Sequence, residues 1–297
     1  MTILKDAATQ AAPYVRRIDP NGMSAPIQRL ITEVIATALS VDVLKRALGS
    51  GLTQVASILR AIPVAEGRLL ERGIRLVAGS NPDLIVLTDN LRLPVTKAAT
   101  EIVAMNEPTL VRSLSLDADQ GGRKSYTPDL LILHRRTGIA HLVDVKRSLG
   151  SYEVSRIAEL KQRMLAASLV VPDLLYKEHR RLHVAEVRVV ILNAENQRSD
   201  IDNGVWPLTD LDHLVEIAGA GHVIEELRGL FRDQVEANWG QAIRAHCAKI
   251  SSICPSVPTP SSVTSATTSL SNDRPADHDA RATLTIGFAR SPRLASG

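Results

Sequence analysis

The sequence predicts an α/β fold whose core follows the order helix, three strands, helix, strand. Apolar residues recur at helical spacing early in the chain, and short apolar runs bounded by turn residues follow between residues 130 and 192. An amphipathic helix separates the last two runs. The chain has 297 residues, 44% of them hydrophobic, which allows one large or two modest domains. Aromatic residues make up only 3%, so the core must consist of Leu, Val, Ile and Ala.

The N-terminal part is predicted to be helical. Residues 1–23 are polar and rich in turn residues, so we expect a flexible arm. In residues 24–72 apolar side chains recur at helical spacing, and Gly49 and Gly51 divide this region into at least two helices. Residues 41–60 have about the length of a helix-turn-helix, but a packing or dimerising helical region fits the pattern better.

Residues 73–195 are predicted to form the α/β core. The continuous apolar run at 130–133 is typical of a central strand that is covered on both faces. The expected elements, in order, are short strands at 74–77 and 84–87, a helix at 94–106, strands at 109–116, 130–133 and 139–146, a helix from 154 towards 170, and a strand at 184–192.

Residues 196–250 are predicted to form C-terminal helices, followed by a disordered tail at 251–297. The tail is rich in Ser, Thr, Pro and Ala and has too few large apolar residues to offset the entropy of ordering. The two cysteines, Cys247 and Cys254, suggest neither a disulfide framework nor a zinc site. We expect a cytoplasmic protein, because no apolar run is long enough to cross a membrane and the N-terminus does not read as a signal peptide.

The positive charge is concentrated in one stretch. Residues 123–163 contain nine Lys or Arg and four acids, a net charge of +5, whereas the whole chain carries +3. The remaining residues therefore sum to −2. Such a concentration suits an anionic partner.

Two short motifs within this stretch carry chemistry. Pro128 and Asp129 open one predicted strand, and Asp144, Val145 and Lys146 lie on the next. Side chains alternate along a strand, so the acid and the lysine of the second motif point to the same face. If the strands pair as a hairpin, two carboxylates and one lysine converge, which is the minimum needed to hold a divalent metal beside a phosphate. An acid in such an apolar setting is costly to bury without a partner or a metal.

Together with the element order, these motifs resemble the PD-(D/E)XK nuclease superfamily. The resemblance covers residues 94–193, about a third of the chain. It implies a restriction-endonuclease-like core, with Mg²⁺ or Mn²⁺ held by Asp129, Asp144 and the backbone carbonyl of Val145. It also implies that Lys146 orients or polarises the attacking water.

In the superfamily a glutamate from the helix before the strands is often a further acid and metal ligand. Glu101 matches this role by its place in the element order, and Glu66 and Glu71 remain open. A second Pro-Asp pair, Pro82–Asp83, has no acid-x-Lys sequence at hairpin distance downstream, so it is assigned to a turn.

The histidines are weaker candidates. His179 and His183 have the spacing of a metal pair but lack a third ligand, so a solvated helix end is expected. His134 and His141 flank the hairpin and are expected at the surface.

The resemblance implies metal-dependent hydrolysis of phosphodiester bonds in nucleic acid, and it favours DNA over RNA. The alternative is a non-catalytic protein that binds nucleic acid or a partner with the same fold. The N-terminal helices offer a surface for a homodimer or an accessory protein. The expected phosphate contacts are Lys124, Arg135, Arg147, Arg156 and Lys161.

Overall fold

The computed structural model describes residues 14–88, 91–120, 124–150, 152–179, 181–196 and 199–253. The chain divides into two compact units, Met1–Cys254 and Pro255–Gly297, and everything below concerns the first. Residues 254–297 of the tail expected at 251–297, and the first 13 residues of the expected arm, lie outside the described residues.

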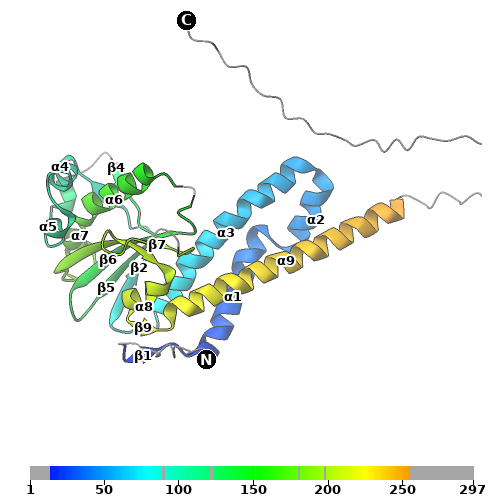
Figure 1. Ribbon diagram of the computed structural model, residues 1–297, viewed down its shortest axis with the longest axis horizontal. Coiled ribbons are helices and arrows are strands. Elements are labelled where there is room, and N and C mark those ends of the chain that lie inside the picture. The colour runs from blue at the N-terminus through cyan, green and yellow to red at the C-terminus, as the bar shows by residue number, and fades with distance from the viewer. Residues whose placement is uncertain are drawn as a thin grey trace, which may run out of the picture. The chain divides into compact units, whose positions relative to one another are not determined.

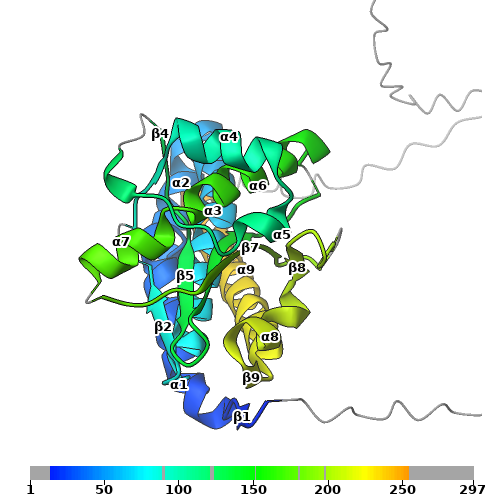
Figure 2. The same ribbon diagram turned by 90° about the vertical axis from the view of Figure 1, so that its left-hand side faces the viewer.

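A mixed five-stranded sheet forms the centre of the α/β fold (Figure 2). Along the sheet the order is β2 (Leu84–Leu87), β5 (Leu130–His134), β6 (Ile139–Lys146), β7 (Glu186–Asn193) and β8 (Val205–Pro207). The first three strands are antiparallel neighbours, whereas β6, β7 and β8 run parallel. The parallel step from β6 to β7 requires a crossover connection, which contains two helices.

Apolar runs on β5 and β6 explain why these strands occupy the middle of the sheet. Their register pairs Leu130 with Val143 and Leu131 with Leu142. Leu130 and Val143 face one hydrophobic cluster, and Leu131 and Leu142 face another. The turn between the strands contains Gly138 at φ +69°, a left-handed conformation that glycine adopts without strain.

Helices cover both faces of the sheet (Figure 1). On one face α3 (Leu52–Ala78) contacts the sheet, and α8 (Leu211–Val215) and the start of α9 (Ala220–Ile253) belong to the same hydrophobic cluster. The helices α1 (Pro20–Ala38) and α2 (Val41–Ser50) pack against α3 and α9. The other face packs against α6 (Val154–Ser168) and α7 (Val171–Glu178). Two further helices, α4 (Lys97–Met105) and α5 (Pro108–Val111), form a third cluster with α6, against which Val189 of β7 also packs. Within the described residues, no helix is both long and apolar enough to cross a membrane.

Two short pairs of strands lie outside the main sheet. Strand β1 (Arg16–Arg17) runs parallel to β9 (Ile217–Ala218), and β3 (Leu93–Val95) pairs with β4 (Lys124–Tyr126). Two short 3-10 helices, η1 (Ala118–Gln120) and η2 (Leu208–Asp210), complete the secondary structure of the described residues. The last residue of β4, Tyr126, joins the cluster on the α6 side of the sheet, just before the Pro-Asp motif.

Most of the predicted core elements are confirmed, and the strand at 139–146 has the predicted bounds. The strand at 84–87 and the helix beginning at Val154 are also present, and Pro82–Asp83 lies in a turn. The helical region at 24–72 contains three helices, with the α2–α3 break at Gly51.

Two strand predictions are wrong. Residues 74–77 continue α3, because Ile74 and Val77 extend the buried stripe that already includes Ile58, Ala65 and Leu70. In place of the strand at 109–116 there is the short helix α5, which Pro108 starts at its first position.

The predicted arm is also too long. Arg16 and Arg17 form β1, and α1 begins at Pro20 behind an Asp19 cap. At the other end, α9 continues to Ile253, past the expected start of the tail.

Candidate active site

The hairpin of β5 and β6 places the two motif aspartates opposite each other. Leu130 pairs with Val143, so the next position of the same register sets Asp129 across from Asp144. Directly opposed residues project from the same face of a sheet. The backbone N–H of Val145 donates a hydrogen bond of 2.6 Å to Asp129 Oδ2, which fixes this carboxylate at the end of β6.

Asp144 is the most buried acid of this group, with 5% of its surface exposed. The hydroxyl of Tyr126 donates a hydrogen bond of 2.8 Å to its Oδ2. The ammonium group of Lys146 lies against Oδ1 as an ion pair. That oxygen is buried, and the lysine ammonium is its ion-pair partner.

Burial and mutual repulsion perturb the acids. Burial, followed by the charge of Asp144, raises the pKa of Asp129 to about 6, against the opposing effects of the Val145 N–H and Lys146. Burial alone would lower the pKa of Lys146, but the attraction of Asp144 and then Asp129 outweighs it and raises that pKa. Burial and the charge of Asp144 also raise the pKa of Tyr126, so its hydroxyl remains a donor. Perturbed groups gathered in this way are typical of functional sites.

A third acid, Glu71, approaches this group from α3. Burial and then the charge of Asp129 raise the pKa of Glu71 to about 7, with Asp144 adding a smaller contribution. The lysine of the site and Arg68 act in the opposite direction. Glu71 therefore lies within electrostatic reach of all three motif side chains.

Glu101, the acid that the element order suggested, does not join them. It lies on α4, half-exposed, and pairs with Lys97 one turn away at 3.4 Å. The reason is topological, because the helix that precedes β2 in the main sheet is α3 and not the helix at 97–105.

Glu66, the other alternative, is already paired. Arg228 donates to its Oε1 at 2.8 and 3.0 Å, and Arg147 lies 3.8 Å from its Oε2. Arg147 also lies 3.7 Å from Glu195, so the arginine expected to bind phosphate is shared between two acids.

The remaining expected phosphate contacts are not gathered at one place. Lys124 and Arg156 are exposed on β4 and α6, and Lys161 donates to Asn203 at 3.4 Å. Arg135 follows β5 and therefore lies at the opposite end of that strand from Asp129. It cannot contact a phosphate bound beside Asp129.

Two residues of the group were absent from the sequence prediction or left open in it. Tyr126 precedes the Pro-Asp motif by two residues, and its phenol is buried under β4 beside Asp144. Glu71 occurs next to the buried pair Leu69 and Leu70 of α3. An acid beside a buried stripe can indicate a site residue, but only once it is known that its helix packs at the end of the sheet.

The residues that would hold a divalent metal are Asp129, Asp144 and the carbonyl of Val145. In the described part of the chain no three His, Cys, Asp or Glu side chains converge closely enough to hold an ion. Magnesium needs only one or two protein carboxylates, with water filling the remaining positions. Oδ1 of Asp144 fits such a role only once the Lys146 ammonium, which contacts it, moves away.

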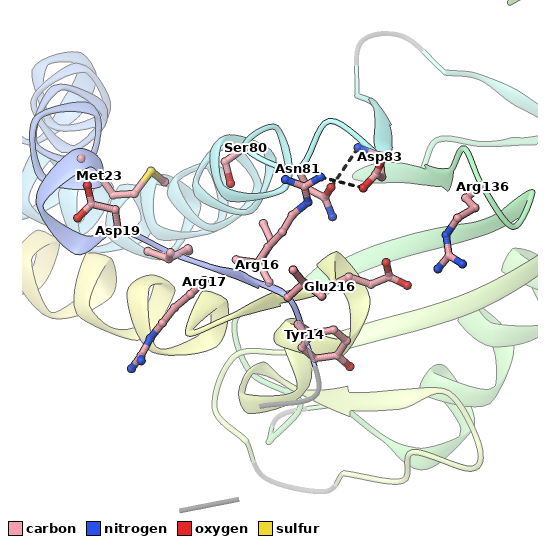
Figure 3. Close-up of a pocket in the computed structure, with 14 residues that line it drawn as sticks. Tyr14, Arg16, Arg17, Asp19, Met23, Ser80, Asn81, Asp83, Arg136 and Glu216 are labelled. Atoms are coloured by element: carbon pink, nitrogen blue, oxygen red, sulfur yellow. Dashed lines mark hydrogen bonds and ion pairs between the residues drawn. The ribbon is translucent and has the colours of Figure 1, made fainter. Parts of the chain in front are cut away.

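A large cavity lies away from this group. It measures about 970 Å³ and lies between the N-terminal segment and the turns at the far end of β2 and β5 (Figure 3). Arg16 crosses it to pair with Asp83 at 3.0 Å, and Arg136 and Glu216 line its rim. Because Asp129 lies at the other end of β5, this cavity is not part of the candidate site.

His134 and His141, expected at the surface, are both buried. Their rings stack edge to face with centroids 5.4 Å apart. Because side chains alternate along a strand, both histidines project from the face of the sheet that carries Leu130 and Val143. The motif aspartates project from the opposite face.

Comparisons with protein-family models, curated proteins and solved structures gave no match to this chain.

Proposed function

We propose that this protein hydrolyses phosphodiester bonds in nucleic acid with a divalent metal, through a restriction-endonuclease-like core. The observation that supports this most is the placement of Asp129 opposite Asp144 with Lys146 paired to the latter. Taken without the inserted β3, α4, α5, β4 and α7, the order α3, β2, β5, β6, α6, β7 supports the proposal, because it resembles the helix, three strands, helix, strand of the PD-(D/E)XK superfamily. The proposed core therefore spans residues 52–193, with a different first helix and first strand from those the sequence suggested.

Each side chain of the site has a proposed role. Asp129, Asp144 and the Val145 carbonyl hold Mg²⁺ or Mn²⁺, which when bound neutralises phosphate charge and acidifies water. Lys146, whose pKa is raised, keeps its charge and offsets that of the substrate. Glu71 has a pKa of about 7, which suits a group that accepts a proton near neutral pH.

A second candidate is a nucleic-acid-binding protein of the same fold that does not turn over substrate. The observation that favours it is the closed state of Asp144, whose oxygens contact Tyr126 and Lys146. Metal binding would require the lysine ammonium to move from Oδ1. Tyr126 would remain as the donor that orients the carboxylate.

A cleavage assay separates the two candidates. Plasmid and single-stranded DNA are incubated with wild type and with the variants Asp144→Ala, Lys146→Ala and Glu71→Gln, in Mg²⁺, in Mn²⁺ and in EDTA. We expect metal-dependent cleavage by wild type, a loss of at least about 100-fold in the first two variants and about 10-fold or more in the third. Glu101→Gln is the matched control and should cleave like wild type.

Absence of cleavage by wild type on either DNA, or equal cleavage by all variants, rules out the enzymatic function. Cleavage that Glu101→Gln abolishes and Glu71→Gln does not would restore the assignment based on element order.

A further inference from the structure

A groove between α1 and α3 carries arginines that the proposed chemistry does not use. It measures about 530 Å³ and is lined by Arg60, Arg68 and Arg72 of α3. Arg68 and Arg72, four residues apart, are neighbours on one side of the helix, and Arg60 lies about two turns earlier on the same side. The floor is apolar and includes Val34 of α1 and Ala65 of α3.

Two of the three arginines are available to a ligand. Arg72 is paired with Glu33 across the groove. Arg60 and Arg68 are exposed, and no described acid lies within ion-pair distance of either. Guanidinium groups bind phosphate through two parallel N–H donors, so a pair of free arginines in a groove is suited to a phosphate chain.

One residue of the groove, Glu71, is within electrostatic reach of the candidate site. Glu71 lines the groove and is also the acid whose pKa responds to Asp129. Arg68 stands close enough to Glu71 to oppose that rise. A strand lying along α3 would therefore place a phosphate at Arg68 next to the acid that faces the hairpin aspartates.

We infer that the groove between α1 and α3 binds the phosphate backbone of a nucleic-acid strand, with Arg60 and Arg68 as its contacts. The direction of the strand towards Asp129 rests on the proposed function, but the binding itself does not. The volume is that of a small-molecule pocket, which favours one strand over a duplex. Three arginines against two glutamates, Glu33 and Glu71, leave the groove with a net positive charge, which favours an anionic chain over an apolar protein segment.

Fluorescence anisotropy with labelled DNA tests this inference. The full chain carrying Asp144→Asn is titrated into a 20-nucleotide single strand, and into a duplex of the same length, in EDTA at three salt concentrations. Arg60→Gln and Arg68→Gln are added singly and together. Arg46→Gln on α2 and Arg232→Gln on α9 are matched controls, because both are exposed arginines that do not line the groove.

We expect the double variant to bind the single strand at least 10-fold more weakly at low salt. Its salt dependence should fall by about 1.4 in slope, because two phosphate contacts are lost at about 0.7 each. The controls should change affinity by less than about 2-fold, and all variants should keep the wild-type urea midpoint.

Binding by the double variant that equals the controls overturns the inference, and a stronger, arginine-dependent affinity for the duplex overturns its single-strand part. If wild type cleaves DNA and the two arginines affect neither binding nor cleavage, the proposed function stands and the groove is not the binding site. If binding depends on the two arginines but wild type does not cleave, the groove binds nucleic acid and the proposed nuclease function is wrong.

Discussion

Arg228 of α9 donates two hydrogen bonds, of 3.0 and 2.8 Å, to Oε1 of Glu66 on α3, and both side chains are largely buried. A third donor of the same guanidinium reaches the carbonyl of Ala194 at 2.6 Å. The N–H of Ala194 in turn donates to the carbonyl of Lys146 at 2.9 Å. The pair therefore links two long helices to the end of β6, where the candidate site begins.

Glu66→Gln should destabilise the protein strongly. The substitution leaves Arg228 buried without its anion, and removing one partner of a buried pair costs about 3–5 kcal/mol. We expect about 3 kcal/mol here, because each side chain retains about an eighth of its exposure. Urea denaturation measures the change in the free energy of unfolding, provided that the slope with denaturant is unchanged.

The matched control is Glu101→Gln, which breaks an exposed pair on α4 and should cost less than about 0.5 kcal/mol. Equal losses in the two variants would show that Glu66 and Arg228 contribute no more than a surface ion pair.

Asp129→Asn should stabilise the metal-free protein at pH 8. Because the pKa of Asp129 is raised to about 6 in the folded state, that state binds the proton more tightly than the unfolded chain does. The contribution of Asp129 to stability is therefore complete below about pH 4 and is lost as the pH rises to about 6. Asparagine cannot ionise, so we expect a gain of about 2 kcal/mol at pH 8 in EDTA and almost none at pH 4.

Magnesium should reverse the order. A ligand at 100 times its dissociation constant stabilises the folded state by about 2.7 kcal/mol, and the asparagine variant should lose most of that gain. Urea titrations at both pH values, with EDTA or MgCl₂, test both parts. An asparagine variant that is less stable than wild type at pH 8 in EDTA, or one that gains as much from magnesium, contradicts the prediction.

The hairpin could be predicted from the sequence because its signals are local. The apolar run at 130–133 and the turn at Thr137 and Gly138 specify two adjacent strands. Alternation then sets the faces, so the opposition of Asp129 and Asp144 follows from a few residues.

The third acid could not be predicted in the same way, because its position depends on which distant helix reaches the sheet. Apolar residues recur at helical spacing around both Glu71 and Glu101. Only the packing of the helices shows which glutamate lies near the hairpin aspartates. Ile74, Leu76 and Val77 are apolar and two of them are β-branched, which is why the end of α3 resembles a strand in the sequence.

His141 should make the protein sensitive to acid. Burial, followed by the charges of His134 and Arg188, lowers the pKa of His141 to about 3, and Glu186 opposes this weakly. Its ring Nδ1 is buried without a hydrogen-bond partner among the described residues. The neutral ring is therefore part of the folded state.

The effect of this histidine on stability has the opposite sign to that of Asp129. A depressed histidine pKa contributes stability that is present above about pH 6.5 and is lost as the pH falls towards 3. At pH 5 the unfolded chain has gained a proton that the folded state lacks, which costs about 2 kcal/mol relative to pH 8.

His141→Phe keeps an aromatic ring beside His134 and Trp206 and removes the titration. The loss of unfolding free energy between pH 8 and pH 5 should therefore shrink by about 2 kcal/mol in this variant, measured by urea denaturation. His183→Gln, at an exposed position, is the control and should leave that loss unchanged. A phenylalanine variant whose loss equals that of wild type would show that His141 is protonated in the folded protein at pH 5.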